Sequence, residues 1–155
     1  MIVYASIIGK DKTGAKNAIL QAHGNRTGKS VTIDRLSGGK PVVLYNGKRE
    51  GGVSVSHTDG LLVIAFSESE VGIDIERTDR QVSDKICKDI REWTRYEAYG
   101  KYLGTGISKK LLQSELPEGL IDSYTFGDYV ISLASEDKKV DIINLTSQVA
   151  FDIII

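Results

Sequence analysis

Residues 61–76 of this chain, LLVIAFSESEVGIDIE, contain two successive patterns that indicate β-strands. The first six residues are all apolar, which is typical of a buried strand. The last six alternate apolar and acidic side chains. Since neighbouring side chains of a strand point to opposite faces, we expect Asp74 and Glu76 on one face and Ile73 and Ile75 on the other.

Short elements separated by glycine are expected on both sides of these strands. The patterns predict strands at 2–8, 30–35, 42–45, 71–76 and in a strand-rich tail over 121–155, with a hairpin over 54–67 that turns at Asp59-Gly60 and a further turn at 126–128. One helix is expected at 13–23, with Thr13 as N-cap and Gly24 just after its end. A second is expected from about 83 to 102, ended by Gly104 and Gly106.

The composition limits the kind of protein this is. A chain of 155 residues with 41% hydrophobic and 26% charged residues predicts one domain over 1–155 with a substantial core. Its net charge of −1 gives no overall attraction to nucleic acid or to an anionic membrane. The single cysteine, Cys87, excludes an intrachain disulfide and suits a reducing compartment. The apolar start, residues 1–8, is too short to span a membrane and lacks the basic region of a signal peptide, so a cytoplasmic location is expected.

The chain has the pattern of an internal duplication. With an offset of 68 residues, the strand at 2–8 falls on 70–76, and the turn and strand at 56–67 fall on 124–135. Few residues are identical, so a chance alignment of two turn-plus-strand units remains the alternative. A true duplication predicts an α+β protein of two similar lobes in one chain, a pseudo-dimer.

The lobes would span about 1–68 and 69–155. The groove between them would then be a natural ligand site, and the protein would be a monomer because one chain supplies both sides.

A second acidic position follows the strand at 71–76. In the helix expected around Trp93, Glu97 and Lys101 lie one turn apart on a shared face. With Asp74 and Glu76, they would form a site for a hard cation bound together with phosphate, as Mg²⁺ prefers a few carboxylates and phosphate oxygens. The alternative is a solvated acidic face, which is common on strands.

Four short motifs resemble, in order and rough spacing, those of the 4′-phosphopantetheinyl transferases. They are Gly39-Lys40-Pro41, Val55-Ser56-His57-Thr58, Gly72-Ile73-Asp74-Ile75-Glu76 and Trp93-x-x-x-Glu97-Ala98-x-x-Lys101. The likeness is greatest to the surfactin-synthetase-activating type, in which two similar lobes lie in one chain. Residues 103–107 also resemble the holo-acyl-carrier-protein synthases. Together the motifs cover roughly residues 38–107.

The resemblance implies a reaction. Coenzyme A would donate its 4′-phosphopantetheine arm to a serine of an apo acyl, peptidyl or aryl carrier protein and release adenosine 3′,5′-bisphosphate. Carried over by motif, Asp74, Glu76 and Glu97 would bind Mg²⁺, with Glu97 also accepting the serine proton. Lys101 would contact the pyrophosphate, Lys40 and Pro41 the adenine side, and Ser56 and His57 the nucleotide phosphates.

Two features depart from the family pattern. Tyr96 stands where the family has a lysine before the glutamate, so phosphate neutralisation should be weaker. The basic residues that hold the 3′-phosphate have no clear counterpart, with Lys16 and Arg26 candidates by position. The alternative function is therefore a degenerate relative that binds coenzyme A or a carrier protein without transfer.

Overall fold

The computed structural model describes residues 1–8 and 11–145 and, within them, ten strands and three helices. The strands are β1 (Ile2–Ile7), β2 (Val31–Arg35), β3 (Pro41–Tyr45), β4 (Lys48–Arg49), β5 (Gly52–Thr58), β6 (Leu61–Ser67), β7 (Val71–Arg77), β8 (Ile121–Phe126), β9 (Tyr129–Ser135) and β10 (Asp141–Asn144). The helices are α1 (Lys12–Thr27), α2 (Ile90–Leu103) and α3 (Lys109–Leu112). The α+β class expected from the sequence is confirmed.

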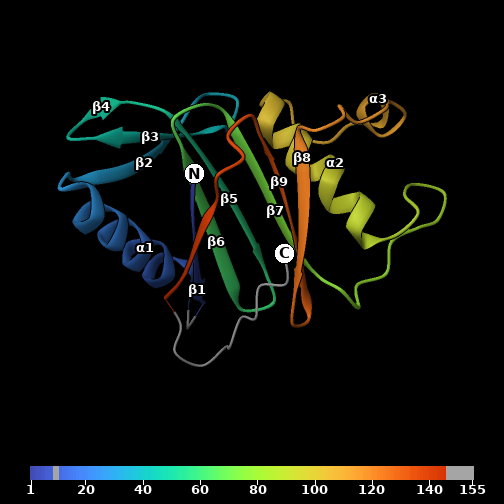
Figure 1. Cartoon of the computed structure of the whole chain (residues 1–155), viewed down its shortest axis with the longest axis horizontal. Helices are drawn as coiled ribbons and strands as arrows, with labels where there is room; N and C mark the ends of the chain where they lie inside the picture. Colours follow the sequence, from blue (N-terminus) through green and yellow to red (C-terminus); the bar gives the residue numbers. More distant parts are fainter. Residues whose placement is uncertain (9–10, 146–155) are drawn as a thin grey trace.

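Two sheets form the centre of the molecule. The β1 sheet has the order β10-β1-β6-β5, and the β7 sheet has the order β7-β9-β8. Their inner faces share one core, in which Val3, Val63 and Ala65 of the β1 sheet meet Ile73 and Leu133 of the β7 sheet. A separate small sheet, β2-β3-β4, lies beside α1 (Figure 1).

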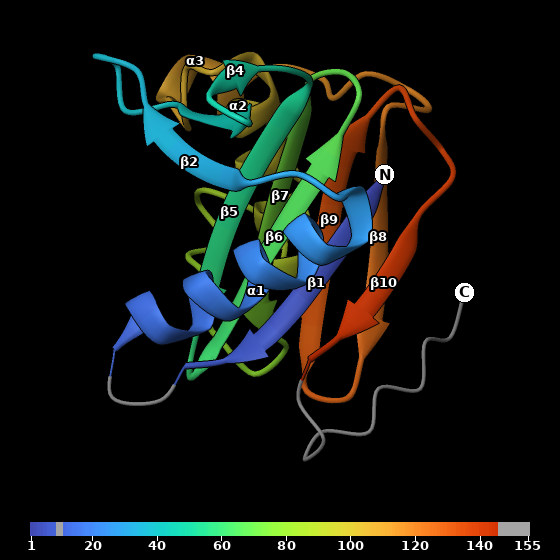
Figure 2. The same cartoon turned by 90° about the vertical axis from the view of Figure 1, so that its left-hand side faces the viewer.

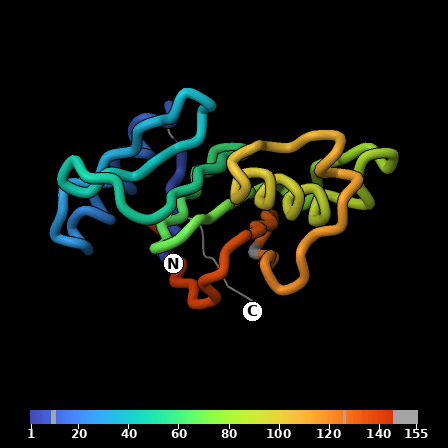
Figure 3. Tube along the Cα trace, turned by 90° about the horizontal axis from the view of Figure 1, so that it is seen from above, coloured from blue at the N-terminus to red at the C-terminus, as the bar shows by residue number. Residues whose placement is uncertain are grey.

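The outer face of each sheet is covered by a helix. Helix α1 crosses the β1 sheet, where Ile19 packs against Tyr4, Ile64 and Phe66 (Figure 2). Helix α2 covers the β7 sheet, and Ala98 packs against Ile121 and Ala134. From above, α1 and the small sheet therefore lie on one side of the strands, with α2 and α3 on the other (Figure 3).

The strand predictions were more accurate than the helix boundaries. The hairpin at 54–67 and the strand at 71–76 are confirmed as β5–β6 and β7. The tail forms β8, β9 and β10 up to 144; the part of the prediction over 146–155 lies outside the described residues. The strand at 71–76 is buried on both faces, because α2 covers the acidic one.

Both helix starts were wrongly predicted. Helix α1 begins at Lys12, and its N-cap is Asp11, whose carboxylate accepts from the Thr13 and Gly14 amides at 2.9 and 3.3 Å. Gly24 lies inside this helix, which ends at the left-handed Gly28. Helix α2 begins at Ile90 rather than near 83, because the side chain of Asp89 caps it through the Glu92 amide.

Gly104 ends α2 as expected, in a left-handed conformation with φ 76°. Where α2 packs against β7, Gly72 of the strand allows the helix and the strand to approach closely. A Cβ at position 72 would lie 1.9 Å from the Ala98 carbonyl oxygen. The glycine of the Gly-Ile-Asp motif thus sets the distance between the strand and the helix that carry the candidate site.

Candidate functional site

One pocket, of about 690 Å³, collects the residues singled out from the sequence. It is bordered by β5, β7, the α2 face, the start of α1 and the β2–β3 turn. Its lining includes Lys40, Pro41, Ser56, His57, Asp74, Glu76, Glu97 and Lys101, which are all the predicted site residues. Residues from position 40 to position 101 therefore meet at one place.

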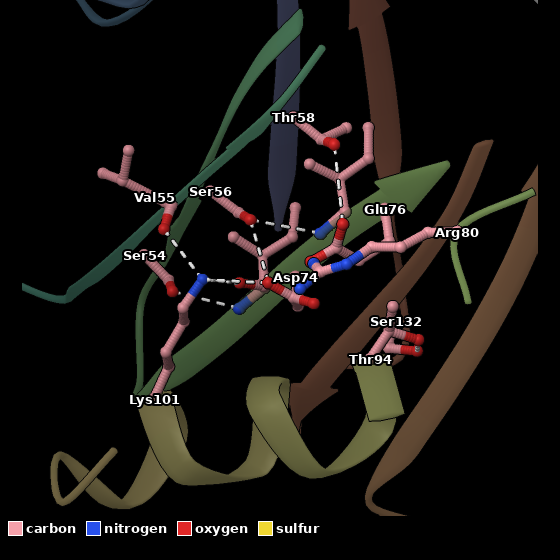
Figure 4. Close-up of polar contacts among 12 residues, drawn as sticks. Ser54, Val55, Ser56, Thr58, Asp74, Glu76, Arg80, Thr94, Lys101 and Ser132 are labelled. Carbon is pink, nitrogen blue, oxygen red and sulfur yellow. Dashed lines mark hydrogen bonds and ion pairs between the residues drawn. The ribbon is translucent and has the colours of Figure 1, made fainter. Parts of the chain in front are cut away.

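The pocket lies along the seam where the two main sheets meet. Strands β5 and β7 belong to different sheets and are joined by side chains. Ser54 Oγ accepts from the Ile73 amide at 3.0 Å, and Ser56 Oγ accepts from the Ile75 amide at 3.1 Å (Figure 4). The Ser56 hydroxyl donates to Asp74 Oδ1 at 3.0 Å and is buried, so its role here is to position Asp74.

Asp74 is the most deeply buried acid of the pocket, with 5% of its surface exposed. Burial raises the pKa of its carboxyl to about 7, against the lowering effect of Lys101, and the charges of Glu97 and Glu76 raise it further. Its Oδ2 atom is buried and has no hydrogen-bond partner among the described residues. A buried, unpaired carboxylate oxygen is costly, and a cation would satisfy it.

Lys101 reaches Asp74 from α2 and ties the seam together. Its ammonium donates to the Val55 carbonyl at 3.2 Å, to the Ile73 carbonyl at 3.0 Å and to Asp74 Oδ1 at 3.2 Å (Figure 4). An ammonium has three N–H donors. All three have protein acceptors in this arrangement, so the ammonium bridges β5 and β7 and has no free donor for a ligand.

Glu76 and Glu97 are the other acids of the pocket. Glu76 is 8% exposed, forms an ion pair with Arg80, and lies 3.5 Å from the Thr58 hydroxyl. Glu97 is half-buried. Burial raises its pKa, Lys101 opposes that effect, and Glu76 adds to it. The three carboxylates are therefore near enough to repel one another, and two cations offset that repulsion.

These acids suit a hard cation in chemical type but are not gathered into a finished ligand set. In the described part of the chain, no three His, Cys, Asp or Glu side chains are grouped closely enough to hold a metal ion. Two of the three carboxylates are instead paired with cations, Asp74 with Lys101 and Glu76 with Arg80. The unpaired Asp74 oxygen still fits a cation. For Glu76 to bind the same cation, its carboxylate would have to leave Arg80.

The opposite side of the pocket is basic. Lys12, Lys16, Arg35, Lys40 and His57 all line it. The Lys12 ammonium lies 2.9 Å from His57 Nε2, and because an ammonium can only donate, Nε2 accepts and the ring proton lies on Nδ1. Desolvation and then Lys12 lower the pKa of His57, which keeps the ring neutral near pH 7.

With Arg80 and Lys101, six Lys and Arg side chains face three carboxylates among the described lining residues. The sequence pointed to Lys16, Lys40 and Lys101. It also suggested Arg26, but Arg26 does not line this pocket and lies 3.8 Å from Asp141. Lys12, Arg35 and Arg80 were not anticipated. The spacing of Glu76 and Arg80 carried no signal either, because residues four apart share a face only in a helix, and these two lie in β7 and in the segment after it.

Position 96 does not face the pocket. The Tyr96 side chain is 9% exposed, and its hydroxyl donates to the Ser114 carbonyl at 2.8 Å, beneath the segment that carries α3. Neighbouring Arg95 donates to the Ile121 carbonyl and to Ser123. The Tyr96 side chain therefore does not line the pocket, and a weaker neutralisation of phosphate than in the family stays a prediction.

No protein-family model matches the sequence, and a search among curated proteins finds none that matches it. None of the helices in the described part of the chain is long and apolar enough to cross a membrane.

Proposed function

We propose that this protein is a Mg²⁺-dependent holo-carrier-protein synthase, which transfers the 4′-phosphopantetheine group of coenzyme A to a serine of an apo acyl, peptidyl or aryl carrier protein. The observation that carries the proposal is the composition of the pocket. Six cationic side chains and three carboxylates, one with a buried unpaired oxygen, meet in a single cavity of about 690 Å³. That combination suits a polyanionic ligand bound together with a hard cation.

The acidic and basic sides of the pocket would bind different parts of the donor, coenzyme A. Asp74, Glu76 and Glu97 would hold Mg²⁺, which when bound neutralises charge on the phosphoryl group under attack. Lys12, Lys16 and His57 would bind the phosphate of the nucleoside end. Lys40, in the β2–β3 turn, and Pro41, at the start of β3, would contact the adenine, with Lys40 held in place by Glu70 at 2.6 Å.

The transfer itself needs one base. The serine oxygen of the carrier attacks the phosphorus that bears the pantetheine arm, and the bond from that phosphorus to the bridging oxygen breaks. Adenosine 3′,5′-bisphosphate leaves with the bridging oxygen. Glu97 accepts the serine proton, and its raised pKa makes it a stronger base than an ordinary glutamate. Lys101 maintains the site by holding Asp74 and both strands.

The order of strands supports an internal duplication, and with it the two-lobe arrangement of 1–68 and 69–155. In the first half, β1 pairs with β6 and β6 with β5; in the second, β7 pairs with β9 and β9 with β8. Strand β6 shifted by 68 residues coincides with β9 in both bounds. The two helices do not coincide under that shift, so the support comes from the strands.

The pairing of Asp74 with Lys101 and of Glu76 with Arg80 favours a second candidate. If those pairs persist when ligand binds, the pocket would bind coenzyme A or a carrier protein without transfer. One experiment separates the two functions: incubate the pure protein with coenzyme A, Mg²⁺ and a panel of apo carrier proteins, and measure the intact masses. Transfer adds one phosphopantetheine to a carrier. Binding of coenzyme A in calorimetry with no mass gain on any carrier would support the second candidate.

A further inference from the structure

Helix α2 offers no free cation for a phosphate beside the three carboxylates, since Arg91 and Arg95 both bond to β8. Tyr96 and Arg95 both bond to backbone carbonyls away from the pocket. Lys101 lies at the carboxylates, but its three donors are directed at Val55, Ile73 and Asp74. A diphosphate bound at the carboxylates would need another cationic partner.

Arg80 has the position and the donors for this role. It lies three residues beyond β7 and lines the pocket next to Glu76. The hydrogen bond to Glu76 and the charges of Glu76, Asp74 and Glu97 raise the pKa of its guanidinium, which places it in the field of all three acids. Half of its side chain is exposed. A guanidinium has five N–H donors in a planar fork that matches phosphate oxygens, and its bond to Glu76 uses one.

The segment that carries Arg80 is anchored. The Thr78 amide donates to the Asp128 carbonyl at 2.8 Å, and the Arg80 amide donates to the Arg77 carbonyl at 3.2 Å. Arg77 forms an ion pair with Asp79 at 3.0 Å. The backbone at position 80 is thus held while its long side chain can reorient.

We propose that Arg80 is an exchangeable cation of the site: it neutralises Glu76 while the pocket is empty, and it binds the diphosphate of the donor once a divalent cation takes Glu76. The inference rests on the proposed function for the identity of the ligand. Arg80 and a divalent cation compete for the same carboxylate, whereas Arg80 and a diphosphate attract each other. Removing Arg80 must therefore change the two affinities in opposite directions.

The test measures binding of two simple probes by calorimetry at low ionic strength: Mn²⁺ alone, and inorganic pyrophosphate added to protein that is already saturated with Mn²⁺. For Arg80→Gln we expect Mn²⁺ to bind several-fold more tightly and pyrophosphate at least tenfold more weakly. Arg80→Lys keeps the charge without the fork, so Mn²⁺ binding should stay near the wild-type value and pyrophosphate should fall between the two. Arg49→Gln, on the exposed strand β4 outside the pocket, is the matched control and should leave both unchanged.

Each of the following outcomes either supports or overturns the inference about Arg80. A loss of affinity for both probes in Arg80→Gln, or no change in either, overturns the inference, and equal melting temperatures for the variants exclude a folding defect as the cause. Failure of the Mn²⁺-saturated wild-type protein to bind pyrophosphate also overturns it. The expected opposite shifts, together with no phosphopantetheine transfer to any carrier, would retain Arg80 as the diphosphate-binding residue and reject the proposed transfer reaction.

Discussion

Asp74 combines deep burial, a raised pKa and one oxygen without a partner among the described residues. The Ser56 hydroxyl and the Lys101 ammonium both bond to its other oxygen. Such an arrangement is costly for folding and is typical of functional sites. The same carboxylate that weakens the core is the one best placed to bind a cation.

We expect Asp74→Asn to lower phosphopantetheine transfer by about 100-fold or more, because the ligand charge is lost. The fold should remain, since burial already disfavours the charged form and the amide oxygen can still accept from Ser56; the free energy of unfolding should change by about 1 kcal/mol or less. The mass assay and a denaturant titration measure the two effects. Full transfer by Asp74→Asn at low Mg²⁺ would contradict a metal role for this residue.

His57 allows a test of how the pocket would bind the nucleoside end of coenzyme A. Its Nδ1 proton is available to a phosphate, and Lys12 lies at its other nitrogen. His57→Ala should weaken the use of coenzyme A by about 10- to 100-fold, since a hydrogen bond to a charged group contributes about 1.5–3 kcal/mol. The use of dephospho-coenzyme A should barely change. Equal losses for both donors would show that His57 does not contact the 3′-phosphate.

At the scale of elements, the site depends on how closely α2 lies on β7. Gly72→Ala places a methyl group against the Ala98 backbone, and we expect a destabilisation of about 1–3 kcal/mol with displacement of Glu97 and Lys101. Gly14→Ala is the matched control, because a Cβ there has nothing within 4 Å and Gly14 lies in α1. That change should be neutral or stabilising by about 0.5–1 kcal/mol. Denaturant titrations of both variants test the contact, and equal stabilities would contradict it.

A second feature at the scale of elements is a buried histidine that joins α1 to two sheets. His23 of α1 is 3% exposed, stacks on Phe66 with ring centroids 3.9 Å apart, and bonds to the Tyr4 and Tyr45 hydroxyls at 3.1 and 2.9 Å. Burial, and secondarily the charge of Arg26, lowers the pKa of His23 to about 4. The neutral ring is therefore the form that the fold requires.

The pH dependence follows from that pKa. The stabilisation from neutral His23 is complete above the unfolded pKa of about 6.5 and is lost as pH falls towards about 4, because only the unfolded chain binds the proton in that range. The loss amounts to about 3 kcal/mol. Denaturant titrations from pH 4 to 8 measure this loss. In His23→Gln, the free energy of unfolding should vary less with pH over this range than it does in the wild type. Parallel profiles for the two proteins would contradict the assignment.

At the scale of the whole molecule, the pocket takes residues from both halves of the chain. Lys12 and His57 come from the first half, and Asp74 and Glu97 from the second. One chain thus supplies the basic and the acidic side of the pocket, and we therefore expect the protein to be a monomer. Light scattering at micromolar concentration should give the mass of a monomer, 17.0 kDa. A trimer that does not dissociate on dilution would contradict this view.

Much of the strand arrangement could be predicted from local pattern. Alternating and continuous apolar runs identified β5, β6 and β7, because side-chain direction along a strand follows directly from sequence parity. Helix starts were less predictable, since Thr13 and Asp11 are both good N-caps and the choice depends on which amides the rest of the fold leaves unpaired. The eight site residues taken from the four motifs all line the pocket, whereas Lys12, Arg35 and Arg80, which also line it, lie outside the motifs.

The residue types that converge at the site, and the strands that carry them, could be inferred from the sequence, because both depend on local chemistry and short periods. The direction of Tyr96, the bridging role of Lys101 and the place of Arg80 beside Glu76 could not be inferred. Each depends on how two sheets and a helix pack, and therefore on contacts between residues that are far apart in the chain. Tertiary packing thus determines which cation of the pocket is engaged by the protein and which one can turn to a ligand.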